Sequence, residues 1–344
     1  MRYVASTMPL MKEATVLEIS QNGRPREHKT DTFEFVSSLA PGDELWLMMG
    51  STNAAVAAAA FRRGVDVRQI SYVRAGGGGA ERKRFTPQDV LELVTANPGA
   101  FYRTFPQDGE VLAVVSAWQD LVLAMEGRKA YANQVRALLQ ARGLLAGVSS
   151  ASEVKEEIER RVGTKDPQDP GMQAFMAQEK EAMAVLEKAV KASEVYRSVF
   201  EPVEGVGPRI AARFMVAIER VDRFATAEDL LRYAGMAPTK DGKLPSRRRG
   251  AVLSRSPGLN NACYMFQEQI FGYGRMSPYG VVLSEQIERE CPCTPEERKA
   301  DKDLRVRHMG AVKRSRINIT RHFLRHVWEG WNEVQGNSVR TAAA

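Results

Sequence analysis

The N-terminal third of the chain alternates short apolar runs with amphipathic segments. Strand patterns cover residues 3–6, 14–19 and 26–29, and the last two are separated by a turn containing Asn22-Gly23. Asn-Gly between strand-like runs is a strong hairpin signal. We therefore expect a β-hairpin that follows the first strand.

Further strands and helices follow along the chain. Residues 44–49 form a continuous apolar run of the length of a buried parallel strand, and residues 65–73 read as another strand. Helices are expected over residues 33–39 and 53–63, with Thr32 and Thr52 as caps and Gly64 closing the second. The pattern predicts a mixed α/β sheet with helices packed on it.

A helix signal follows a glycine-rich segment. Residues 74–84 contain four consecutive glycines without dinucleotide-binding spacing, which favours a surface loop over a substrate loop. Thr86-Pro87 then has the form of a helix start, with threonine as the cap and proline at the first helical position.

The middle of the chain has helical periodicity. Residues 110–141 carry an apolar stripe, and residues 153–162 and 172–200 resume as charged amphipathic segments. Long helices of this kind pack on each other or on a second subunit. We read residues 110–200 as a helical connector and expect a homo-oligomer to form through it.

Composition narrows the class of protein. The chain has 344 residues, three cysteines and a formal net charge of +7. The absence of a membrane-length apolar run and of a signal peptide predicts no membrane association, and few cysteines favour a cytoplasmic location. The positive charge favours a polyanionic partner such as nucleic acid.

A glycine turn precedes a helical pattern at residues 203–214. Gly205 and Gly207 let backbone N–H groups approach a phosphate, and Arg209 and Arg213 add positive charge. This spacing fits a helix-hairpin-helix that holds the DNA backbone without reading sequence. The alternative is an ordinary packing corner between two helices.

A basic segment and two serines follow. The cations predicted to bind DNA phosphates are Lys240, Lys243, Arg247, Arg248, Arg249 and Arg255. Ser254 is the first candidate nucleophile and Ser256 the second. The alternatives are a solvated loop, and a serine that caps the helix opening near Leu259.

These motifs together resemble a known family. EGVGPRIAARFMVAI, then RFATAEDLLRYAGMAP, a basic loop and Val252-Leu253-Ser254-Arg255, are similar to the C-terminal domain of the "IS one-ten" insertion-sequence transposases, which include the Piv-like invertases. Residues 309–331 resemble the closing basic helix of that domain. The serine segment departs from the family because it is shorter and has Asn260-Asn261 where paired arginines are usual.

The resemblance implies a fold and a domain order. It implies an α/β RNase-H or RuvC-like domain over residues 1–109, a long helical coiled-coil connector over 110–200, and an α-helical C-terminal domain with a helix-hairpin-helix over 201–335. Residues 336–344 would form a flexible tail.

The resemblance also implies a DNA recombination chemistry. Four carboxylates would hold Mg²⁺, the serine would attack a DNA phosphate, and a structured RNA would guide target choice. Position by position, Ser6 and Met48 stand where the first two acids belong, and Asp89 and Glu92 match the last pair. Two of the four acids are therefore missing. Glu13, Glu18 and Glu44 are possible substitutes, and Asp89 and Glu92 have the alternative of being first-turn helix acids.

Three readings of function follow. The chain is an RNA-guided transposase or recombinase that uses Ser254, an inactive nucleic-acid-binding relative with a regulatory or assembly role, or a structural DNA-binding protein without RNA. The Cys291-Pro292-Cys293 motif and the histidines have poor spacing for structural zinc, so satisfied or exposed histidines are the expected state.

Overall fold

The computed structural model describes residues 1–6, 8, 13–20, 24–48, 51–70, 75, 85–145, 151–163, 165–238, 255–274 and 276–342. The chain divides into two compact units. Unit 1 comprises Met1–Leu112, Glu219–Ala225 and Glu329–Ala344, and unit 2 comprises Ala113–Ile218 and Thr226–Trp328.

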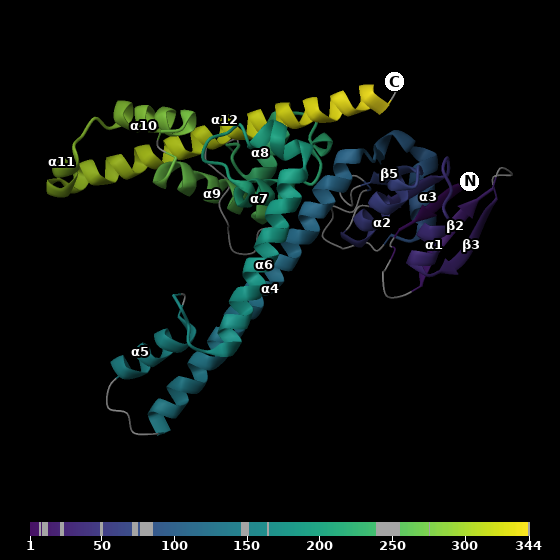
Figure 1. Ribbon diagram of the computed structural model, residues 1–344. Coiled ribbons are helices and arrows are strands. Elements are labelled where there is room, and N and C mark those ends of the chain that lie inside the picture. Colours follow the sequence, from purple (N-terminus) through teal and green to yellow (C-terminus); the bar gives the residue numbers. More distant parts are fainter. Residues whose placement is uncertain are drawn as a thin grey trace. The chain divides into compact units, whose positions relative to one another are not determined.

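Unit 1 contains a six-stranded mixed sheet in the order β3-β2-β1-β4-β5-β6 (Figure 1). The strands are β1 (Arg2–Ala5), β2 (Ala14–Ile19), β3 (Pro25–Thr30), β4 (Glu44–Met48), β5 (Asp66–Ile70) and β6 (Tyr102–Arg103). Strands β1, β4 and β5 run parallel, and the other neighbouring pairs are antiparallel. The predicted mixed α/β sheet is confirmed. Strand β6 has only two residues and was not predicted.

Alternation along the central strands buries both faces of this sheet. Leu45 and Leu47 pack with helices α1 (Thr32–Ser38) and α2 (Ser51–Arg62), whereas Trp46 and Met48 pack with α3 (Pro87–Ala96). A strand buried on both faces reads as a continuous apolar run, as β4 does. The helices therefore cover the sheet from two sides, and a short η1 (Pro98–Ala100) follows α3.

Two predicted helix caps of unit 1 are wrong by one or more positions. Asp31 caps α1, because its Oδ1 accepts from Phe33 N at 2.8 Å and Glu34 N at 3.1 Å, so Thr32 is the first helical residue. Helix α2 begins at Ser51, which places Thr52 inside the helix. Gly64 has the expected left-handed conformation, with φ of +80°.

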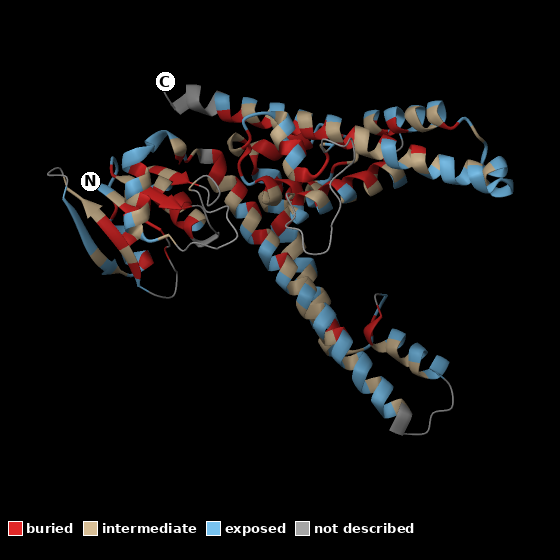
Figure 2. Cartoon of the chain, turned by 180° about the vertical axis from the view of Figure 1, so that it is seen from behind, coloured by how far each residue is buried: buried red, intermediate tan, exposed pale blue. Residues whose placement is uncertain are grey.

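Two long helices form an antiparallel pair in unit 2. Helix α4 (Pro106–Leu145) lies beside α6 (Pro170–Ala192), and α5 (Ala151–Val162) lies between them in sequence (Figure 1). Arg128 bonds to Glu179 at 2.6 Å, and the rings of Tyr131 and Phe175 lie 5.3 Å apart. Much of the pair is exposed or half-buried (Figure 2). The helix predicted over residues 172–200 is interrupted at Ser193.

The remaining helices of the chain are η2 (Tyr196–Phe200), α7 (Pro208–Ile218), η3 (Val221–Arg223), α8 (Ala227–Ala234), α9 (Pro257–Gly272), α10 (Pro278–Glu290), α11 (Pro295–Ala300) and α12 (Lys302–Ala342). All belong to unit 2 except η3 and the end of α12. Helix α12 includes most of residues 336–344. No helix in the described part of the chain is long and apolar enough to span a bilayer.

An aromatic cluster holds these helices together. Phe323 of α12 stacks on Phe266 of α9 at 4.2 Å between ring centroids and meets Phe214 of α7 edge-on at 5.1 Å. Phe200 and Tyr279 complete the cluster from η2 and α10. Aromatic pairs at these separations add to the stability gained from burial alone. The cluster therefore fixes the positions of η2 and α7, which flank the glycine turn.

Candidate nucleic-acid interface

The glycine turn lies between η2 and α7. Gly205 has φ of +90°, and a Cβ there would lie 3.1 Å from Ile270 Cδ1 of α9. Glycine meets both demands because it tolerates positive φ and has no Cβ. At Gly207 a Cβ would meet nothing within 4 Å. The two glycines thus differ: the first is required by the fold, and the second leaves open space.

The turn leaves backbone donors free. Among the described residues, the N–H groups of Gly205, Gly207 and Arg209 have no hydrogen-bond acceptor, whereas Ile210 N donates to Gly207 O at 3.0 Å. The first N–H groups of a helix have no partner within the helix and attract anions. Gly207 and Arg209 are exposed, so a phosphate can reach this end of α7.

The two arginines of α7 turn toward α4. The guanidinium of Arg213 lies 4.9 Å from the ring centroid of Trp118, and Nη2 of Arg209 lies 3.9 Å from Met125 Sδ. Burial and the neighbouring charge of Arg209 lower the pKa of Arg213. Arg213 is half-buried and held by a cation–π contact. Arg209 is the more accessible cation of the pair.

The end of α8 and the start of α9 are bound to each other. Ser256 N donates to Tyr233 O at 2.8 Å, and Asn260 Nδ2 donates to Ala234 O at 3.0 Å. Gly235 ends α8 with φ of +73°, and a Cβ there would lie 2.5 Å from Cδ of Arg255. We call these contacts the α8–α9 clamp. It holds together the two residue stretches that flank 239–254.

Ser256 is the N-cap of α9, because its Oγ accepts from Leu259 N at 3.2 Å. The cap, which was the alternative to a nucleophile, is therefore what the structure shows for this serine. Ser254 precedes the cap by two residues in sequence. Ser254, Lys240, Lys243, Arg247, Arg248 and Arg249 lie outside the described residues. Arg255 is described and half-buried beside Gly235.

Helices α7 and α9 are antiparallel neighbours. The glycine turn before α7 meets Ile270 near the end of α9, whereas Gly258 at the start of α9 lies near Ala217 at the end of α7. At about 1.5 Å per residue, the 11 residues of α7 separate these two ends by about 16 Å. The glycine turn and the Ser256 cap therefore lie at opposite ends of α7.

Three arginines of the closing helix are engaged within unit 2. Arg314 pairs with Glu290 at 2.6 Å, Arg325 pairs with Glu228 at 2.6 Å, and Arg321 donates to Met236 O at 2.8 Å. These contacts attach α12 to α8 and α10. Charges paired in this way contribute less to binding a polyanion than unpaired ones.

The carboxyl ends of β1 and β4 meet at Asn53 of α2. The Asn53 amide donates to Ser6 O at 2.7 Å and Met48 O at 2.8 Å, and its Oδ1 accepts from Met8 N at 2.8 Å. All three bonds are buried, and Asn53 is 3% exposed. Ser6 and Met48 are the positions at which the family resemblance requires acids. A neutral amide that binds backbone groups joins the two strands there.

Asp89 and Glu92 of α3 do not form a pair of free carboxylates. Asp89 completes a capping box with Thr86: its Oδ2 accepts from Thr86 N and Thr86 Oγ1, both at 2.7 Å. Glu92 is exposed. Within the described residues, no group of three acidic side chains has the closeness that a metal ion requires. Asp89 thus has the structural role that was its alternative.

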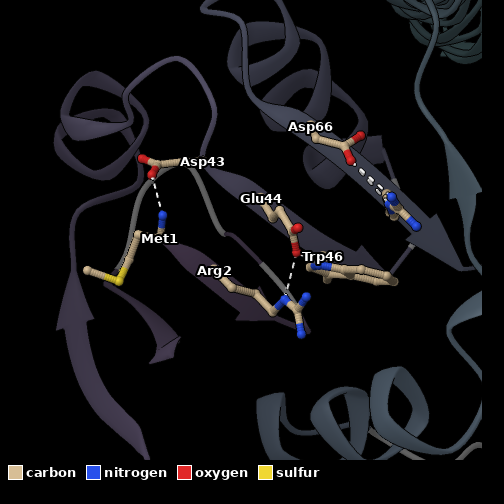
Figure 3. A network of polar contacts seen from close by, with 7 residues as sticks. Met1, Arg2, Asp43, Glu44, Trp46 and Asp66 are labelled. Carbon is tan, nitrogen blue, oxygen red and sulfur yellow. Dashed lines mark hydrogen bonds and ion pairs between the residues drawn. The ribbon is translucent and has the colours of Figure 1, made fainter. Parts of the chain in front are cut away.

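The carboxylates of the sheet gather at its other end. Asp43, Glu44 and Asp66 lie at the amino ends of β4 and β5, and Figure 3 shows them facing cations. Glu44 Oε2 accepts from Arg2 at 2.6 Å, which is the main cause of its lowered pKa. Glu44 therefore cannot replace the acids missing at Ser6 and Met48. Of the possible substitutes, Glu13 directly precedes β2, beside the carboxyl end of β1.

Two functional-site neighbours were missed by sequence reasoning. Asn53 falls within the helix predicted over residues 53–63, and Trp118 within the apolar stripe predicted over residues 110–141. An asparagine just after a buried parallel strand was a usable signal, because that is where the carboxyl ends of the strands need capping groups. Nothing in the sequence paired Trp118 with Arg213, 95 positions away.

The segment around the glycine turn matches a known protein family. Residues 197–242, which hold the glycine turn, α7 and α8, match the family described as Transposase IS116/IS110/IS902. No curated protein matches the chain. The resemblance predicted from the sequence is therefore confirmed over this segment, and the chain carries the segment shared by transposases of the IS116/IS110/IS902 family.

Proposed function

We propose that the protein binds DNA through the α7 glycine turn and the start of α9, and that it is a transposase or site-specific recombinase with Ser254 as nucleophile. The observation that carries the proposal is the coincidence of the family match with exposed, unpaired N–H groups at Gly207 and Arg209. Donors of this kind hold phosphates without reading the bases.

The glycine turn and the start of α9 lie about 16 Å apart along α7, which corresponds to about five base-pair steps of duplex DNA. The glycine turn would therefore hold a phosphate several steps from the one that reacts. This division suits a hairpin that positions the substrate and a serine that performs chemistry.

The serine step is a phosphoryl transfer. The Ser254 oxygen forms a bond to phosphorus while the bond from phosphorus to a deoxyribose oxygen breaks, and the serine proton leaves as the departing oxygen gains one. The product is a covalent phosphoserine link to one DNA end. Ser254 lies two residues before the cap of the 16-residue α9, whose positive end favours a nearby phosphate.

The Mg²⁺ site that the resemblance implies is not offered by the described residues. Ser6 and Met48 provide no carboxylate, Asn53 binds the backbone between them, and Asp89 is bound to Thr86. Surroundings without free carboxylates do not suit Mg²⁺, which prefers oxygen ligands.

We further propose the fold and the partners that the family resemblance implies. The sheet order and strand directions suit an RNase-H or RuvC-like fold for unit 1. The paired helices flanking the glycine turn suit a helix-hairpin-helix. A structured guide RNA, a homo-oligomer formed through α4 and α6, and a cytoplasmic location complete the proposal.

The test is an adduct assay on the purified full chain. Incubation with the native flanking DNA and Mg²⁺ or Mn²⁺ should give a protein–DNA adduct that survives denaturation and disappears in Ser254→Ala. Ser256→Ala is the matched control: it removes a cap worth about 1 kcal/mol but should keep the adduct. RNA that co-purifies with the chain would support the guide. An adduct retained in Ser254→Ala would refute the assignment of the nucleophile.

A second candidate function is favoured by the Asn53 contacts. An amide in place of the acidic site fits a transposase relative that binds nucleic acid for regulation or assembly without cutting it. Steeply salt-dependent DNA binding without any adduct would establish this reading. A flat salt response would contradict both functions.

A further inference from the structure

Two cysteines and a histidine of unit 2 lie close together. Cys291 is the C-cap of α10, Cys293 lies further along the connection to α11, and His308 belongs to α12. One ligand atom from each lies within 4.8 Å of the other two. Two of the chain's three cysteines and one of its four histidines are thus gathered in one place.

We propose that Cys291, Cys293 and His308 form a zinc site. Thiolate and imidazole are the ligands that Zn²⁺ prefers, and three protein ligands with a fourth open position are an established arrangement. The fourth position is open to water or to the Glu288 carboxylate, which lines the same cavity of about 500 Å³.

The distances are close to those of a tetrahedral site. Zn–S and Zn–N bond lengths place two such ligands about 3.5–3.8 Å apart. The two Sγ atoms lie 2.9 Å apart, and the widest separation in the group is below 4.8 Å. Side-chain movements of about 1 Å therefore complete the geometry. Cys-x-Cys spacing alone did not predict this, because the third ligand comes from α12.

Arg298 does not block the histidine. Its Nη1 lies 3.1 Å from Nδ1 and 3.2 Å from Nε2 of His308. An atom bound in the ring plane to the lone pair of one nitrogen would lie well beyond 3.2 Å from the other ring nitrogen. The guanidinium therefore lies over the ring face and leaves the lone pairs available.

The zinc would join the end of α10 and its connection to α11 with the start of α12. The connection from α10 to α11 contains four residues, Cys291 to Thr294, and His308 lies in the second turn of α12. Binding energy in such a site stabilises the fold, because the unfolded chain lacks the arranged ligands. The proposed ion therefore clips α10 and α11 to the start of α12, independently of DNA chemistry.

The test uses the full chain purified without chelator. Metal analysis should find about one zinc per chain, and Co²⁺ exchanged into the site should give the thiolate charge-transfer and d–d bands of a tetrahedral complex. Cys293→Ser and His308→Asn should each weaken zinc binding by more than the roughly 10- to 100-fold typical of losing an outer partner. His322→Asn, an exposed histidine elsewhere on α12, is the control and should bind normally.

Stability provides an independent readout. A strong chelator should lower the Tm of the wild type and leave the Tm of His308→Asn unchanged, with circular dichroism showing that both remain helical. Zinc below about half an equivalent, or zinc binding by Cys293→Ser and His308→Asn equal to that of the wild type, would overturn the proposal. So would an intact mass two hydrogens short in the metal-free chain, because that shows a Cys291–Cys293 disulfide instead.

Discussion

The carboxyl edge of the sheet in unit 1 and the ends of α7 and α9 in unit 2 are both places where a transposase would handle DNA, and they are built in opposite ways. At the sheet edge, Asn53 satisfies three backbone groups inside the protein. At the glycine turn, the N–H groups of Gly207 and Arg209 have no partner in the described chain, and both residues are exposed.

Hydrogen-bond partners and exposure together distinguish structural polar groups from those that can bind a ligand. A polar group that is buried and fully bonded is costly to alter and contributes to folding. An exposed donor without a partner contributes little to folding and is available to a ligand. By this measure the glycine turn of unit 2 is available to a ligand, whereas the described carboxyl edge of the sheet in unit 1 is part of the scaffold.

The largest effect is expected from breaking the sheet edge. Asn53→Ala leaves Met8 N, Ser6 O and Met48 O buried without partners and should lower the free energy of unfolding by about 3 kcal/mol. Chemical denaturation measures this. The control is Asn133→Ala on the exposed face of α4, expected to change stability by less than about 0.5 kcal/mol. Equal effects at the two asparagines would contradict the comparison.

The two glycines of the turn should separate folding from binding. Gly205→Ala forces a side chain into positive φ against Ile270, at a cost of about 1–2 kcal/mol. Gly207→Ala meets no atom and should leave stability unchanged, yet its Cβ should weaken DNA binding by keeping the phosphate away. Thermal unfolding and DNA titration measure the two effects. Full binding by Gly207→Ala would remove the turn from the interface.

The smallest effect concerns Glu44 at the amino edge of the sheet. Its folded pKa is lowered by Arg2, so its stabilising contribution is present above the unfolded pKa of about 4.3 and is lost as pH falls through the folded value. Glu44→Gln should therefore cost less than about 1 kcal/mol at neutral pH and nothing in acid. Glu13→Gln, an exposed acid, provides the baseline for the acid titration.

Local sequence signals made most of the sheet predictable. β2 was placed at its observed bounds, and β1, β3, β4 and β5 to within a few residues, because Asn22-Gly23 marks the hairpin and β4 is a continuous apolar run. The Thr86 cap was also predictable, since capping chemistry is local. The break at Ser193 and the two-residue β6 could not be found, because each depends on contacts that periodicity does not record.

The candidate site was less predictable, because its geometry depends on contacts between distant segments. The glycine turn was visible in five consecutive residues. The stacking of Arg213 on Trp118, and the approach of His308 to Cys291 and Cys293, join positions far apart in sequence. Residue types at those positions have several equally ordinary roles, so their chemistry appears only when the chain is folded.

The α8–α9 clamp fixes both ends of the stretch of chain that it encloses. Tyr233 and Ser256 are bonded main chain to main chain, so the stretch between them begins and ends at one fixed point. Doubling the length of a closed segment costs only about 0.6 kcal/mol. With both ends fixed in this way, the stretch between Tyr233 and Ser256 can change in length at a small entropic cost.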